Sequence, residues 1–154
     1  MRTYVDANFL VRLFLQLPGH DEVLALIGDE SDDLHGQLPM TDILRFEVQN
    51  AIYRMVFESR AGGQWRVTPE AAAIGLADFE ERISHGVRLR RVPLSLADID
   101  SEFSSLAARF TAKHGFRTYD IMHVASAITL RCRRFFSFDV KAKKLAKLAG
   151  LQTN

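Results

Sequence analysis

Three aspartates of this 154-residue chain stand where an expected strand gives way to an expected helix. Asp6 and Asp139 each follow a short apolar run typical of a β-strand, and Asp120 begins a helical pattern. In an open α/β sheet, ligands bind beyond the carboxyl ends of the strands, so we expect all three carboxylates at one rim of the molecule. Aspartate is also a favoured helix N-cap, and capping alone explains any one of them taken singly.

Glu47 lies inside a helical pattern over residues 43–57 and therefore cannot be a cap. Apolar residues one turn before and one turn after it place its carboxylate on, or at the edge of, the face that packs on the sheet. Desolvating an ionised carboxylate costs several kcal/mol unless it is paired or bound to a metal. Two interpretations stay open here: a salt bridge to Arg45, Arg54 or another basic residue, or a metal ligand.

The four acids together predict a site for a divalent cation. Clustered carboxylates raise one another's pKa values unless a cation neutralises them, so we expect at least one raised pKa in the metal-free site. Mg²⁺ and Mn²⁺ take oxygen ligands of this kind, and we expect the four carboxyl groups to converge on a common point. A metal held there can polarise a phosphoryl oxygen and supply a bound hydroxide for attack on a phosphodiester.

The net charge of +1 conceals an asymmetry between the two halves of the chain. Residues 1–77 hold 6 basic and 11 acidic side chains, whereas residues 78–154 hold 14 basic and 8 acidic ones. This pattern indicates a polyanionic partner such as nucleic acid, with solvated helix faces as the alternative. Arg117, Lys141 and Lys144 are close in sequence to the acids, and we expect them to contact this polyanion.

The composition is that of an ordinary globular domain, with 47% hydrophobic and 25% charged residues. Cys132 is the only cysteine, which excludes a disulfide scaffold and fits a reducing compartment. No targeting segment or membrane span is visible in the sequence, so we expect a cytoplasmic protein without a membrane partner.

Short apolar runs alternate with longer helical patterns, which predicts βα units around a parallel sheet. The expected strands are residues 3–5, 38–40, 87–92 and 134–138, with an edge strand possible from Leu151 onward. The expected helices are residues 9–15, 20–27, 43–57, 69–86, 95–114, 119–131 and 140–149. The expected fold is one domain over residues 1–154, a three-layer α/β/α sandwich with a mainly parallel sheet of four or five strands. The strands that lead to Asp6 and Asp139 should be central.

Four segments of the sequence resemble a PIN domain, and specifically the VapC toxins of bacterial type II toxin–antitoxin modules. They are residues 4–8 (YVDAN), 46–51 (FEVQNA), 118–127 (TYDIMHVASA) and 136–139 (FSFD). The resemblance covers nearly the whole chain in the family's order, although residues 64–91 carry little of it.

The resemblance implies a metal-dependent endoribonuclease that uses Mg²⁺ or Mn²⁺. Its acidic quartet would be Asp6, Glu47, Asp120 and Asp139. Its supporting polar residues would be Asn8, Thr41 and Ser137. It also implies a small VapB-like antitoxin that presents an Arg or Lys to the acids, and a homodimer that uses exposed apolar parts of residues 9–17 and 43–57. The RNA target is not indicated.

Two other classes of protein compete with this interpretation. A HAD-like phosphatase also has an Asp after its first strand, but it needs a second Asp at the position of Asn8. A receiver-like phosphoacceptor domain fits Lys141 after a late strand, but no acidic pair precedes Asp6 and Glu47 stays unexplained. Outside the quartet, His123 is interpreted as a second-shell or surface residue rather than a metal neighbour. Trp65 is interpreted as a loop anchor rather than a stacking platform for a base.

Overall fold

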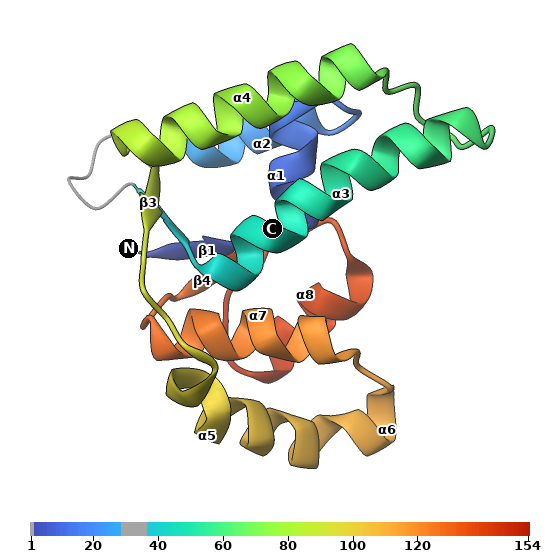
Figure 1. The fold of residues 1–154 in the computed structure, drawn as a ribbon. Helices are drawn as coiled ribbons and strands as arrows, with labels where there is room; N and C mark the ends of the chain where they lie inside the picture. Colours follow the sequence, from blue (N-terminus) through green and yellow to red (C-terminus); the bar gives the residue numbers. More distant parts are fainter. Residues whose placement is uncertain (1, 29–36) are drawn as a thin grey trace.

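The computed structural model describes residues 2–28 and 37–154, and it shows helices on both sides of short parallel strands (Figure 1). Helices of the first half of the chain pack on one another on one side, and those of the second half pack on the other. The first group is α1 (Ala7–Phe14), α2 (His20–Gly28), α3 (Asp42–Arg60) and α4 (Pro69–His85). The second is α5 (Leu96–Leu106), α7 (Thr118–Thr129) and α8 (Val140–Leu148). The predicted α/β/α sandwich is confirmed.

The strands form two parallel pairs. They are β1 (Thr3–Val5) with β4 (Arg134–Phe136), and β2 (Leu38–Met40) with β3 (Leu89–Arg91). Because β1 also lies beside β2, the spatial order is β3, β2, β1, β4. The strand expected from Leu151 onward is reduced to a single parallel bridge between Gln152 and Arg134. β1 is therefore central, as predicted, whereas β4 ends the order of the described strands, with the bridge to Gln152 on its other side.

The described strands do not form the one continuous sheet that the sequence predicts, and Pro39 supplies a physical reason. Leu38 donates its N–H to Arg88 at 2.8 Å, and Met40 accepts from the N–H of Val92 at 2.9 Å. Successive residues of a strand direct their backbone polar groups to opposite sides, so those of Pro39 face β1. Proline has no N–H, and β2 therefore lacks the donor that would join it to β1.

Two predicted helix starts are confirmed by their caps. The hydroxyl of Thr68 accepts from the N–H of Ala71 at 3.1 Å, and Ser95 and Asp98 form a capping box. The helix predicted over residues 95–114 is helical throughout but not uniform. α5 leads into one π-helical segment, η1 (Ala107–Thr111), and then into the short α6 (Ala112–His114). Gly115 ends it at φ 64°, a left-handed conformation that favours glycine.

The largest fully buried side chains of the described core are aromatic. Tyr4 on β1 stacks on Phe135 on β4, with ring centroids 5.9 Å apart. Phe14 on α1 meets Phe79 on α4 edge-on at 5.2 Å. Trp65 is half-buried and packs against this core, as the anchor interpretation expects. None of the described helices is long and apolar enough to cross a membrane.

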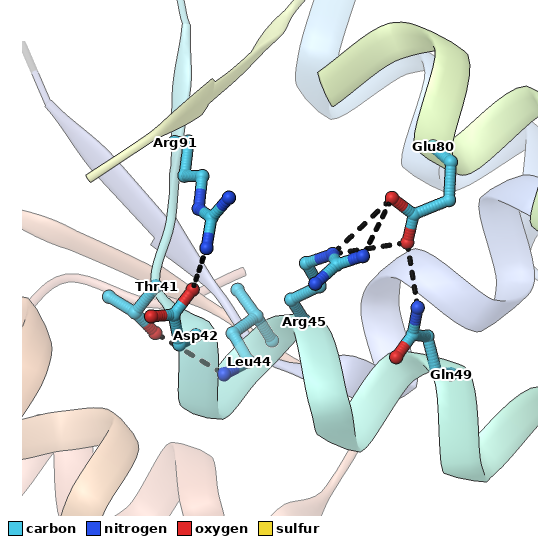
Figure 2. A network of polar contacts seen from close by, with 7 residues as sticks. All are labelled: Thr41, Asp42, Leu44, Arg45, Gln49, Glu80 and Arg91. Atoms are coloured by element: carbon cyan, nitrogen blue, oxygen red, sulfur yellow. Dashed lines mark hydrogen bonds and ion pairs between the residues drawn. The ribbon is translucent and has the colours of Figure 1, made fainter. Parts of the chain in front are cut away.

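A polar clamp fixes α3, the helix that carries Glu47, to its neighbours (Figure 2). Glu80 of α4 accepts from the guanidinium of Arg45 at 3.0–3.3 Å and from the amide of Gln49 at 2.8 Å. At the start of α3, Asp42 accepts from Arg91 of β3 at 3.0 Å. Three polar contacts to two elements therefore add to the buried apolar face in holding α3 in place.

Replacing Glu80 with Ala should lower the free energy of unfolding by about 1–2 kcal/mol, because two donors lose one shared acceptor. The Arg45 side chain is only 25% exposed, so water replaces the lost bonds poorly. Urea unfolding measures the change, with Glu81→Ala at the exposed neighbouring position as control. Equal stability of the two variants would show that the clamp does not stabilise α3.

Candidate functional site

The four predicted acids, which come from four separate segments of the chain, line one pocket of about 710 Å³. Asp6 follows β1 and Asp139 follows β4, at the same end of a parallel strand pair. Asp120 lies in the first turn of α7, and Glu47 reaches the pocket from the middle of α3. The structure thus brings all four side chains to one rim of the fold.

Asp6 is the most deeply buried member, with 5% of its surface exposed. One carboxylate oxygen accepts from the N–H of Phe9 at 3.0 Å and caps α1, and the other accepts from the hydroxyl of Ser137. Burial raises the pKa of Asp6 to about 6 from its ordinary value of 3.8, because an ionised carboxylate is poorly solvated there. One raised pKa was expected, but desolvation is its main cause and repulsion by Glu47 is a smaller one.

Ser137 connects Asp6 to Asp139. Its hydroxyl donates to Asp6 and accepts from the N–H of Asp139 at 2.8 Å. Asp139 in turn caps α8, where its Oδ1 accepts from the N–H of Lys141 at 2.7 Å and of Ala142 at 3.1 Å. The buried Ser137 therefore determines the spacing of two acids from behind the pocket.

Arg117 lies between the carboxylates of Asp120 and Asp139. Its guanidinium is 3.1 Å from Oδ2 of Asp139 and 3.6 Å from Oδ2 of Asp120. Its backbone N–H also donates to Asp120 at 3.0 Å. The Arg117 side chain is 67% exposed, so its ion pairs are weakly held and it can turn toward solvent. The residue predicted to contact RNA is thus a direct neighbour of the acids.

Glu47 is paired, but with neither of the arginines that the sequence suggested. Its Oε2 accepts from Nε2 of His123, whose Nδ1 lies 3.1 Å from the hydroxyl of Tyr4. Arg45 binds Glu80 and Arg54 binds Glu58, so neither is the partner of Glu47. His123 is buried, so it is not the surface residue that was one of its two expected placements. No role for Tyr4 was predicted from the sequence.

The predicted supporting residues occupy different places. Asn8 is exposed and lines the pocket. Thr41 is fully buried, caps α3 through the N–H of Leu44 at 3.2 Å, and lies 3.3 Å from the Tyr4 hydroxyl. Lys141 and Lys144 are exposed on α8, outside the pocket lining.

Two exposed aromatic side chains on the pocket rim were missed in the sequence. Phe46 and Tyr119 are 60% and 57% exposed, and each immediately precedes an acid of the quartet. Successive side chains of a helix point about 100° apart. When an acid points into the pocket, the side chain directly before it in the helix therefore points toward the edge of the pocket. An aromatic residue directly before a candidate acid in a helix is the pattern that could have predicted these two residues.

The donor chemistry of the site fits a hard divalent cation, because its acidic side chains offer only carboxylate oxygens. In the described part of the chain, no three His, Cys, Asp or Glu side chains are grouped closely enough to hold an ion. Arg117 contacts Oδ2 of Asp120 and Oδ2 of Asp139, so a cation that binds these two oxygens competes with its guanidinium. Convergence of the quartet on one point remains a prediction.

A three-layer sandwich with acids beyond its parallel strands defines an α/β domain with an oxygen-rich pocket. The model of the PIN domain family matches residues 3–148, and the chain therefore belongs to the PIN domain family. No curated protein matches the sequence. A chain in the crystal structure of VapBC2 from Rickettsia felis, bound to a DNA fragment from their promoter, is similar in fold. The TM-score is 0.64 at 15% sequence identity, over 100% of this chain and 98% of that chain.

Proposed function

We propose that this PIN-domain protein is a metal-dependent endoribonuclease and the toxin of a VapBC-type toxin–antitoxin module. The observation that carries the proposal is the placement of four acids, from four segments of a PIN fold, around one pocket. Asp6, Glu47, Asp120 and Asp139 would hold Mg²⁺ or Mn²⁺. When bound, the metal supplies charge neutralisation and an activated water for hydrolysis of the RNA phosphodiester.

The test is incubation of the purified protein with total RNA and Mg²⁺ or Mn²⁺, followed by mapping of new 5′ ends. Discrete new ends that need both the metal and Asp6 support the proposal. The Asp6→Asn protein, prepared in parallel, controls for contaminating nucleases. Cleavage of equal extent by that variant, or in excess chelator, would contradict it.

RNA binding needs cations outside the quartet, since the acids repel a phosphodiester backbone. Arg117, Lys141 and Lys144 are exposed and belong to the basic half of the chain. We expect Lys141→Ala, and more strongly the double change with Lys144→Ala, to weaken RNA binding but not metal binding. Arg117→Ala should also weaken RNA binding.

The slope of log affinity against log salt measures this effect. Each lost phosphate contact should lower the slope by roughly 0.7 for single-stranded RNA. Binding is measured with Ca²⁺ in place of Mg²⁺ to limit cleavage, and exposed Arg60 in the acidic half is the control, as Arg60→Ala. An unchanged slope in the double lysine variant would show that α8 does not hold the substrate.

The proposed partner is a small VapB-like antitoxin that presents an Arg or Lys to the acids. Arg117 supports this chemistry, because a guanidinium already lies within 3.1 Å of Asp139 and 3.6 Å of Asp120. An antitoxin from the neighbouring gene should block cleavage and protect the pocket from Mn²⁺. A version of the antitoxin in which the basic residues are replaced should neither block cleavage nor protect the pocket from Mn²⁺.

We also propose a homodimer, and the exposed apolar side chains favour α3 over the first helix as its interface. Phe46, Tyr53 and Phe57 of α3 are 60–71% exposed. In residues 9–17, by contrast, most large apolar side chains are buried in the core, so this segment offers a partner little surface. Light scattering at micromolar concentration tests the dimer, and Phe57→Glu should yield the monomer.

A further inference from the structure

A chain of hydrogen bonds begins and ends on α3. At the start of this helix, the Oγ1 of Thr41 accepts from the N–H of Leu44 at 3.2 Å. The hydroxyl of Tyr4, on β1, lies 3.3 Å from Thr41 Oγ1 and 3.1 Å from Nδ1 of His123, on α7. Nε2 of His123 then contacts Oε2 of Glu47, again on α3. The chain therefore connects three elements and reaches the pocket at its His123–Glu47 end.

Each hydroxyl group has one proton to donate, and this determines which partner donates in each of these hydrogen bonds. Thr41 accepts from a backbone N–H, which leaves its own proton free to donate to the Tyr4 oxygen. Tyr4 can then donate to Nδ1 of His123, and the ring proton of neutral His123 lies on Nε2, facing the carboxylate of Glu47. The opposite neutral tautomer would direct a lone pair of Nε2 at an ionised carboxylate. Only the Nε2–H form satisfies every member with an uncharged ring.

Burial makes this arrangement rigid. Tyr4 and Thr41 have no exposed surface, and His123 is 3% exposed, so water cannot replace a lost bond in the chain. Glu47 and His123 both line the pocket, but only the Glu47 side chain, at 32% exposed, is substantially open to solvent.

Glu47 needs such support because of its position in a helix. Asp6, Asp120 and Asp139 each accept from a free backbone N–H at a helix start, at 2.7–3.1 Å. Glu47 lies inside α3, where backbone N–H groups bond within the helix. A Glu side chain also has more freely rotating bonds than an Asp side chain, so more conformational freedom must be removed to fix it.

We propose that His123, held in its Nε2–H tautomer by Tyr4, is a positioning residue that fixes one oxygen of Glu47 and leaves the other for a cation. The proposal rests on the proposed function, since it takes Glu47 as a metal ligand. With Nε2 donating to Glu47 and Nδ1 accepting from Tyr4, neither ring nitrogen has a lone pair left for a metal. His123 thus acts on the metal through Glu47.

Calorimetric titration of the full-length, RNA-free protein with Mn²⁺ tests the proposal without measuring cleavage. His123→Ala should weaken Mn²⁺ binding about 10–100-fold, as is usual when a partner of a metal ligand is lost. His123→Gln, whose amide can both donate to Glu47 and accept from Tyr4, should recover part of the loss. Tyr4→Phe should lose less than His123→Ala, because the ring remains while its tautomer is no longer held.

Two controls separate positioning from general destabilisation. His85→Ala changes an exposed histidine at the end of α4 and should leave Mn²⁺ affinity unchanged. Ile52→Val removes a methyl group from the buried face of α3 and lowers stability without touching the chain of bonds. Its affinity should equal that of the unchanged protein. If His123→Ala does not fold, His123→Gln and Tyr4→Phe still carry the comparison.

The ¹⁵N NMR signals of the imidazole give a second readout at pH 7.5. We expect the His123 proton on Nε2 in the unchanged protein, and a mixture of the two neutral tautomers in Tyr4→Phe. A proton on Nδ1 alone, or a doubly protonated ring in the unchanged protein, would overturn the proposal, as would Mn²⁺ affinity in His123→Ala equal to that of Ile52→Val. Failure of the unchanged protein to bind Mn²⁺ would instead overturn the metal dependence, and the tautomer measurement would still decide the chain of bonds.

Discussion

Replacing Asp6 with Asn is expected to abolish RNA cleavage and, at the same time, to stabilise the metal-free protein at neutral pH. Loss of a partner behind a metal ligand already costs about 10–100-fold in affinity or activity, so loss of the ligand's own charge should cost at least about 100-fold in both. The stabilising effect has a different origin, because Asp6 is 5% exposed and its ionised form is poorly solvated.

The Asn side chain can keep both hydrogen bonds that hold this position. Its oxygen can accept from the N–H of Phe9, and its amide can donate to the hydroxyl of Ser137. Thermal unfolding in chelator and calorimetry with Mn²⁺ measure the two effects on the same samples. Asp100→Asn, the same change at an exposed position, should alter neither. Lower stability of Asp6→Asn at pH 8 would contradict the expectation.

The second large effect is a fall in the contribution of Asp6 to the stability of the metal-free protein as the pH rises from about 4 to about 6. The folded pKa of Asp6 is about 6 and its ordinary value is 3.8, so folding favours the protonated carboxyl. The contribution of the neutral form is complete below the unfolded pKa and is lost as the pH rises through the folded one. At 1.36 kcal/mol per pKa unit, the loss above pH 6 amounts to about 3 kcal/mol.

Urea unfolding at a series of pH values, in the presence of chelator, measures this dependence. Other carboxylates act in the opposite direction, since hydrogen bonds lower the pKa values of Glu70 and Asp98 in the folded protein. The difference between the unchanged protein and Asp6→Asn therefore isolates the contribution of Asp6. A difference that does not change between pH 4 and pH 8 would show that Asp6 titrates as it does in the unfolded chain. Added Mn²⁺ should restore the lost stability at pH 8.

Much of the fold could be predicted because it depends on neighbours a few residues away. Thr68, Ser95 and Asp139 cap helices through N–H groups two or three residues further on. The apolar run before Asp6 forms strand β1, as its local pattern predicts. The break between the two strand pairs could not be predicted from local sequence. It depends on whether the backbone polar groups of Pro39 face β1 or β3, which only the packed structure shows.

The sequence by itself determined the chemical character of the site: acidic side chains at strand ends, one further acid inside a helix, and a basic second half. Only the tertiary structure decided their partners. His123 meets Glu47 across 76 positions of the chain, and Arg117 meets Asp139 across 22. Asp6 is likewise buried by elements that are distant in sequence, and this burial is the main cause of its raised pKa. Local patterns encode hydrogen bonds to nearby backbone, whereas side-chain partners and desolvation follow from how helices and strands pack.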